Sequence, residues 1–169
     1  MESQLVEEAH SRGIALDDVD ARNLEAIDRD GWAVVMVAPR ADESFAPFAY
    51  TIGLSERAGS ELILIGLDPF VAARILNSIA ENAASEGSLR PGPLPDILEG
   101  DYVVDLRLMD PSRYEEYLGR LLWFHDTFGR EPLRVMQVLW PDQHGRYPDE
   151  YEVTAGDRRP ELQPLLDRP

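Results

Sequence analysis

Five short apolar runs, each bounded by turn-forming residues, most restrict the fold that this sequence can adopt. They cover residues 32–38, 48–54, 61–67, 102–108 and 134–140 and are rich in valine, isoleucine, leucine and aromatic residues. Runs of this length and composition are typical of β-strands rather than helices, and the first one, which ends at a proline, predicts a buried strand. Because the connections among the first three runs are short, we expect a mostly antiparallel sheet of about five strands.

Three segments predict helices that pack against this sheet. Residues 16–29 carry apolar side chains at helical spacing behind an acidic N-terminal cluster, and Gly31 is the expected end. The Asp-Pro pairs at 68–69 and 110–111 each combine a helix N-cap with proline at the first helical position. An apolar stripe follows each pair, and the second stripe predicts one long helix that continues to Gly129. The expected fold class is therefore α+β, with two or three helices packing the sheet.

The length and composition of the chain fit one globular domain. Its 169 residues are 44% hydrophobic and 28% charged, which is ordinary for a folded domain. We expect an N-terminal extension over residues 1–15, a single globular α+β domain over residues 16–148, and a polar, proline-containing C-terminal tail over residues 149–169.

The charge and the missing residue types exclude several classes of function. The chain has 32 acidic and 16 basic residues, a formal net charge of −16, which argues against nucleic acid and against a membrane surface as partners. All the basic residues are arginine and there is no cysteine, so lysine and cysteine chemistry and disulfides are ruled out. With no apolar run near the roughly 20 residues that a membrane helix needs, we expect a cytoplasmic protein.

Two stretches offer candidate binding residues. On the second strand, Tyr50 and Thr51 present hydroxyl groups, and Gly53 would allow close approach of a ligand or another backbone. The alternative is that Tyr50 packs in the core and that Gly53 marks a bulge. At the end of the last strand, Trp140, Asp142 and Arg146 supply an indole, a carboxylate and a guanidinium that would suit an anionic or planar ligand.

For this second stretch the alternative is a tight turn, in which Asp142 caps backbone groups and Arg146 pairs with it. His125 lies near the end of the long predicted helix, where it could act as a general base or simply satisfy a hydrogen bond in the core. His10, His125 and His144 have no ligand-type spacing, so we expect no metal site. There is also no glycine-rich phosphate loop between a strand and a helix.

Several separate motifs then occur in a fixed order along the chain. One is Pro-Phe-Ala-Tyr-Thr-Ile-Gly-Leu, and the full set lies at 31–35, 47–54, 61–67, 110–118, 137–142 and 145–148. In these motifs the chain resembles a bacterial family described only as domain of unknown function 4262. It departs from the family pattern at Asp30, where members often have histidine, and at residues 59–60, where they often have His-Pro. The resemblance implies a shared fold and a common site, and the family has no established activity to transfer.

The leading hypothesis from the sequence is a small-molecule or protein binding module. Its site would be a polar and aromatic rim formed by Tyr50, Thr51, Trp140 and Arg146, and no cofactor is expected. The alternative is an enzyme, either a flavin-binding reductase similar to the split-barrel proteins or a hydrolase that uses His125 or Asp142 as base. A third possibility is assembly with a second copy, as a homodimer that buries exposed aromatic residues.

Overall fold

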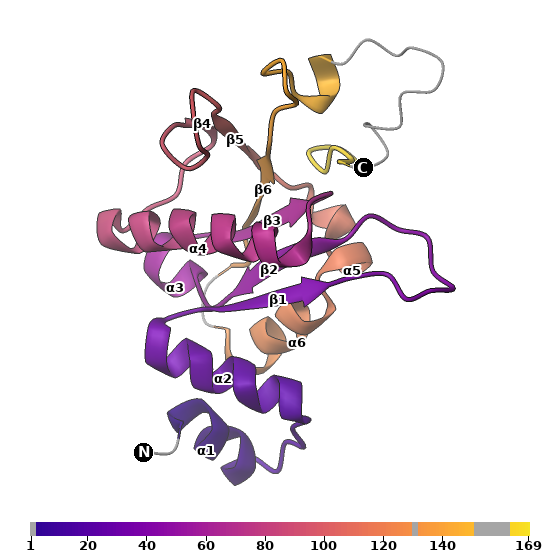
Figure 1. Cartoon of the computed structure of the whole chain (residues 1–169). Helices are drawn as coiled ribbons and strands as arrows, with labels where there is room; N and C mark the ends of the chain where they lie inside the picture. Colours follow the sequence, from indigo (N-terminus) through magenta and orange to yellow (C-terminus); the bar gives the residue numbers. More distant parts are fainter. Residues whose placement is uncertain (1–2, 130–131, 151–162) are drawn as a thin grey trace.

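A six-stranded mixed sheet forms the centre of the molecule, with helices on both of its faces (Figure 1). The computed structural model describes residues 3–129, 132–150 and 163–169. The strand order is β1-β2-β3-β6-β5-β4, and neighbouring strands are antiparallel except for the central parallel pair β3 and β6. The strands are β1 (Ala33–Val37), β2 (Phe48–Ile52), β3 (Glu61–Ile65), β4 (Gly92–Leu94), β5 (Val104–Leu108) and β6 (Val135–Leu139).

The α+β class and the mostly antiparallel sheet are therefore confirmed, with six strands rather than five. The additional strand, β4, has only three residues and includes Pro93. The segment around it, residues 85–100, is rich in glycine and proline, which favours a connection rather than a strand. Because β4 is an edge strand, it tolerates a proline that a central strand would not.

Different helices of the described residues cover the two faces of the sheet. Helix α4 packs on one face, whereas α5 and α6, together with Ile27 of α2, pack on the other. The α-helices are α1 (Gln4–Ser11), α2 (Asp18–Asp30), α3 (Ser55–Ala58), α4 (Pro69–Glu86), α5 (Tyr114–Tyr117) and α6 (Gly119–Phe128), and 3-10 turns lie at Pro111–Arg113 and Pro148–Glu150. None of the helices in this part of the chain is long and apolar enough to cross a membrane.

The acidic N-terminus and the end at Gly31 that were predicted for this helix are confirmed in α2, although it begins at Asp18 rather than at residue 16. The Asp17 carboxylate accepts hydrogen bonds from the N–H groups of Val19 and Asp20 and so caps the first turn. Gly31 has a φ of 95° and ends the helix in the left-handed conformation that glycine adopts without strain.

The prediction of a single long helix after the second Asp-Pro pair is wrong, because the helix is interrupted at Leu118. That residue has φ −112° and ψ 34°, outside the helical range, and it separates α5 from α6. The N–H of Arg120, in the first turn after the break, donates to the Tyr50 hydroxyl at 3.3 Å. Apolar residues keep the same spacing on both sides of the break, which is why the periodicity did not reveal it.

Two apolar cores lie on opposite faces of the sheet. Along β2, Ala49 belongs to the core under α4, whereas Phe48, Tyr50 and Ile52 belong to the core under α5 and α6. All residues of β2, β3 and β6 are buried, as expected for central strands. The strand expected within residues 32–38 forms as β1, but it is not buried as expected, because it is an edge strand whose Met36 is 45% exposed.

Both ends of the described chain also contribute buried residues. Helix α1 packs on α2 through Ala9, which is fully buried. Near the C-terminus, Leu166 is fully buried in the core under α5 and α6, and its N–H donates to Oε1 of Gln137 at 2.9 Å. Residues 151–162 of the expected tail lie outside the described residues.

Candidate functional site

The rim expected between Tyr50 and Trp140 is not assembled, because the two side chains lie on opposite faces of the sheet. Tyr50 is 2% exposed and packs in the core under α5 and α6, where burial raises the pKa of its phenol. Trp140 packs against the core under α4, and its indole N–H donates to the carbonyl of Ile65 at 2.8 Å. These two residues therefore cannot share one binding pocket.

Thr51 belongs to a buried hydrogen-bond network around Glu61. The Thr51 hydroxyl donates to Oε2 of Glu61 at 2.6 Å and accepts the N–H of Leu62 at 2.9 Å. The backbone N–H groups of residues 53–55 also donate to the Glu61 carboxylate, at 2.9, 3.2 and 3.1 Å. Burial raises the pKa of the Glu61 carboxyl, and these donors oppose that rise. The network fixes the turn from β2 into α3.

Close packing, rather than an approaching ligand, accounts for Gly53. It has a φ of 94°, and a Cβ atom at this position would lie 3.0 Å from Cγ2 of Ile27 on α2. Sequence reasoning missed the role of Glu61, although a charged residue at the start of an otherwise apolar strand was a usable signal.

Asp142 and Arg146 form the tight turn that the sequence offered as the alternative. Oδ1 of Asp142 accepts the N–H groups of His144 and Arg146 at 2.8 and 2.9 Å, and Nε of Arg146 donates to Oδ2 at 3.0 Å. Burial raises the pKa of Asp142, but these bonds and the guanidinium outweigh it and hold that pKa at about 2. A carboxylate with so low a pKa is a weak general base at neutral pH.

His125 lies in the last turn of α6, with its side chain 30% exposed and its Nδ1 4.0 Å from the carboxylate of Asp126. Its ring and backbone pack tightly against Gly129, where an added Cβ would lie 2.7 Å from the ring atom Cδ2. Among the described residues, no group of three or more histidine and carboxylate side chains could hold a metal ion.

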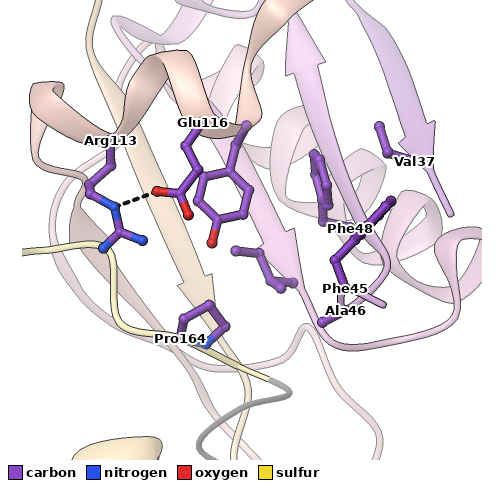
Figure 2. Close-up of a pocket in the computed structure, with 9 residues that line it drawn as sticks. Val37, Phe45, Ala46, Phe48, Arg113, Glu116 and Pro164 are labelled. Carbon is purple, nitrogen blue, oxygen red and sulfur yellow. Dashed lines mark hydrogen bonds and ion pairs between the residues drawn. The ribbon is translucent and has the colours of Figure 1, made fainter. Parts of the chain in front are cut away.

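A cleft of about 630 Å³ opens elsewhere, between the end of β1, the following loop, β2 and α5 (Figure 2). We call it the aromatic cleft. Its lining residues are Val37, Phe45, Ala46, Phe48, Ile65, Arg113, Glu116, Tyr117 and Pro164.

Three aromatic rings form the apolar part of this cleft. The rings of Phe48 and Tyr117 meet edge to face with centroids 5.3 Å apart, and Phe45 lies 6.2 Å from Phe48. Behind them, Tyr50 stacks on Phe48 at 6.2 Å. Phe48 is 7% exposed whereas Phe45 is 41% exposed, so the cleft has a fixed inner ring and an accessible outer one.

One ion pair forms the polar part of the cleft. Nε of Arg113 donates to Oε2 of Glu116 at 2.7 Å, and the guanidinium carbon lies 5.9 Å from the centre of the Tyr117 ring. The bond from Arg113 lowers the pKa of Glu116 and raises that of the guanidinium. Figure 2 shows this pair on one side of the cleft and Phe45 and Phe48 on the other.

The sequence reasoning missed the aromatic cleft. Phe45 lay in a segment that we treated only as a connection between strands, and Tyr117 was assigned to the apolar stripe of a helix. The one local signal was the pair Phe45 and Phe48, because two large apolar side chains close together beside a connection can form an apolar patch on the surface.

A family model with the description "Domain of unknown function (DUF4262)" matches residues 26–154. The chain belongs to this family. Comparison with curated proteins and with solved structures gave no match. The Glu61 network joins two of the motifs through which the sequence resembled DUF4262 proteins, those at 47–54 and 61–67. Apart from Pro164, the residues that line the aromatic cleft also lie within the matched segment.

Proposed function

We propose that this protein is a small-molecule binding module whose ligand places an aromatic or flat apolar group in the aromatic cleft. The observation that carries the proposal is the cleft itself, in which three aromatic rings and a single ion pair line one hollow. Its volume of about 630 Å³ lies in the range of roughly 300–1,000 Å³ that is typical of small-molecule sites.

The cleft is built on elements that hold its shape. Phe48 belongs to a central strand and is packed from behind by Tyr50, and Ile65 belongs to the neighbouring strand β3. A wall of this kind needs little reordering when a ligand binds, and this lowers the entropic cost of binding. Among the three aromatic residues of the cleft, Phe45, which lies in the loop before β2, is the most exposed.

The ion pair would bind the polar part of the ligand. A guanidinium has five N–H donors, and the bond to Glu116 uses one from Arg113. The carboxylate of Glu116 is half-exposed and can accept a hydrogen bond from a ligand N–H or O–H. We therefore expect a ligand with a flat apolar body and a polar edge that both donates and accepts.

We prefer binding to catalysis because the bases considered from the sequence lie outside this cleft. His125 and Asp142 are not among the residues that line it. Asp142 is in addition engaged in its own turn, with a pKa of about 2.

The test uses the fluorescent probe 8-anilinonaphthalene-1-sulfonate, with indole as a competitor. We expect saturable binding to the folded protein, displacement by indole, and about tenfold weaker binding to Phe45→Ala, equivalent to about 1.4 kcal/mol. Phe70→Ala is the matched control, because Phe70 is also exposed, at 71%, but does not line the cleft. Equal weakening in both variants, or no displacement by indole, would refute the proposal.

A further inference from the structure

Strand β1 is an edge strand without the usual protection. It lies at one end of the strand order, and its five residues pair one to one with β2. Its sequence, Ala-Val-Val-Met-Val, contains neither a charge nor a proline. Exposed edges are normally protected by charged residues, proline or bulges, because unpaired main-chain groups attract other strands.

The register shows which main-chain groups of β1 face outward. The N–H of Gly66 donates to the carbonyl of Pro47 at 2.8 Å, so residue 47 turns its main-chain groups toward β3. In an antiparallel ladder this direction alternates, so residues 48, 50 and 52 of β2 turn toward β1. The partners of these residues on β1 are residues 37, 35 and 33, and their main-chain groups bond to β2. Val34 and Met36 lie between these partners. They therefore turn their N–H and C=O groups away from the sheet.

A hollow of about 550 Å³ runs along this open edge. We call it the edge groove, and Figure 1 shows β1 between the two helices, α2 and α4, that flank it. Its lining residues are Ala26, Arg29, Asp30, Trp32, Ala33, Val34, Met36, Ala73, Asn77 and Glu81.

The side chains around the edge groove offer an extended chain both apolar and charged contacts. Met36 is 45% exposed and lines the groove together with Ala73 of α4, which gives an apolar side. The indole N–H of Trp32 donates to Oδ1 of Asn77 at 2.9 Å and thereby fixes the indole ring. The carboxylate of Glu81 also lines the groove, together with an ion pair in which Arg29 donates to Asp30 at 2.7 Å. Alternate residues of an added strand would therefore face α4, where Ala73 and Glu81 lie, and the end of α2, where the Arg29–Asp30 pair lies.

We infer that the edge groove binds a basic, extended segment of a partner protein, which adds to β1 as a seventh strand. Strand addition obtains affinity from main-chain hydrogen bonds and specificity from alternate side chains. The charge decides the occupant. A second copy would bring a further net charge of −16 to a chain of the same charge, whereas a basic segment is attracted to it.

Two synthetic eight-residue peptides test this inference, one alternating valine with lysine and the other alternating valine with glutamate. Calorimetric titration should show binding of the lysine peptide, weakened by added salt, and at least tenfold weaker binding of the glutamate peptide. Equal binding of the two peptides, or no binding of the lysine peptide, would overturn the inference.

Two substitutions at Met36 separate main-chain from side-chain effects. Met36→Pro removes an outward N–H donor, whereas Met36→Thr loses the same side chain and keeps the donor. We expect at least tenfold weaker peptide binding to Met36→Pro than to Met36→Thr, with circular dichroism confirming that both are folded. Equal binding of the peptide to the two variants would contradict strand addition. Sedimentation measures whether the protein is a dimer. If it is, and if only Met36→Pro breaks the dimer, the edge binds a second copy instead. Neither variant should change probe binding in the aromatic cleft.

Discussion

Replacing Thr51 by valine should destabilise the protein far more than the similar size of the two residues suggests. The substitution removes the acceptor of the buried Leu62 N–H and one of the donors to the Glu61 carboxylate. An unpaired buried donor costs about 1–3 kcal/mol, and a hydrogen bond to a charged group contributes about 1.5–3 kcal/mol. The additional buried methyl group returns about 0.8 kcal/mol. The expected loss is therefore about 2–5 kcal/mol, a large part of the roughly 5–15 kcal/mol by which a domain is stable.

Urea unfolding followed by tryptophan fluorescence measures this loss. Thr51→Ser is the matched control, because it keeps the hydroxyl and removes one methyl group, at a cost of about 1 kcal/mol. The slope of the free energy of unfolding against urea should stay unchanged if both variants unfold in one step. If Thr51→Val proves as stable as Thr51→Ser, the Glu61 network does not contribute as described.

Three further predictions concern stability and use the same urea measurement. The pKa of Asp142 is about 2 in the fold, below its ordinary value of 3.8. Its carboxylate therefore stabilises the fold above pH 3.8 and loses this effect as the pH falls toward 2. Asp142→Asn should therefore flatten the loss of stability in this window, and an unchanged acid profile would contradict the assignment. Leu166→Ala should lower the free energy of unfolding by about 2–5 kcal/mol, because this side chain is fully buried. Leu165 is half-buried, so Leu165→Ala should lower it clearly less. Equal losses would show that the C-terminal segment is not packed in solution. Gly53→Ala should be more destabilising than Gly13→Ala. Both glycines have positive φ, but only at Gly53 would the added Cβ meet a neighbouring side chain. Equal effects would show that the packing at Gly53 is loose.

Much of the fold could be predicted from local signals. The Asp17 cap and Gly31 fix the ends of α2, and the Asp-Pro pair at 68–69 fixes the start of α4, because capping is a local interaction. The strand runs were recognisable by composition. Local signals could not show the break at Leu118, where the Tyr50 hydroxyl from a distant strand accepts the N–H of Arg120.

The candidate site was much less predictable. Which face of the sheet a residue occupies depends on the exact start of each strand, and this separates Tyr50 from Trp140. The aromatic cleft joins residues from the loop before β2 and from α5, about 70 positions apart in the sequence. No local pattern links Phe45 to Tyr117, so only the folded chain brings them together.

The aromatic cleft is tested most directly by nuclear magnetic resonance of the protein with isotope-labelled phenylalanine during titration with indole. The chain has five phenylalanines, so each ring can be followed separately. We predict saturable shifts at Phe45 and Phe48, which line the cleft, and none at Phe70. Shifts that spread equally over all five rings, or that spare Phe45 and Phe48, would contradict a binding site in the aromatic cleft.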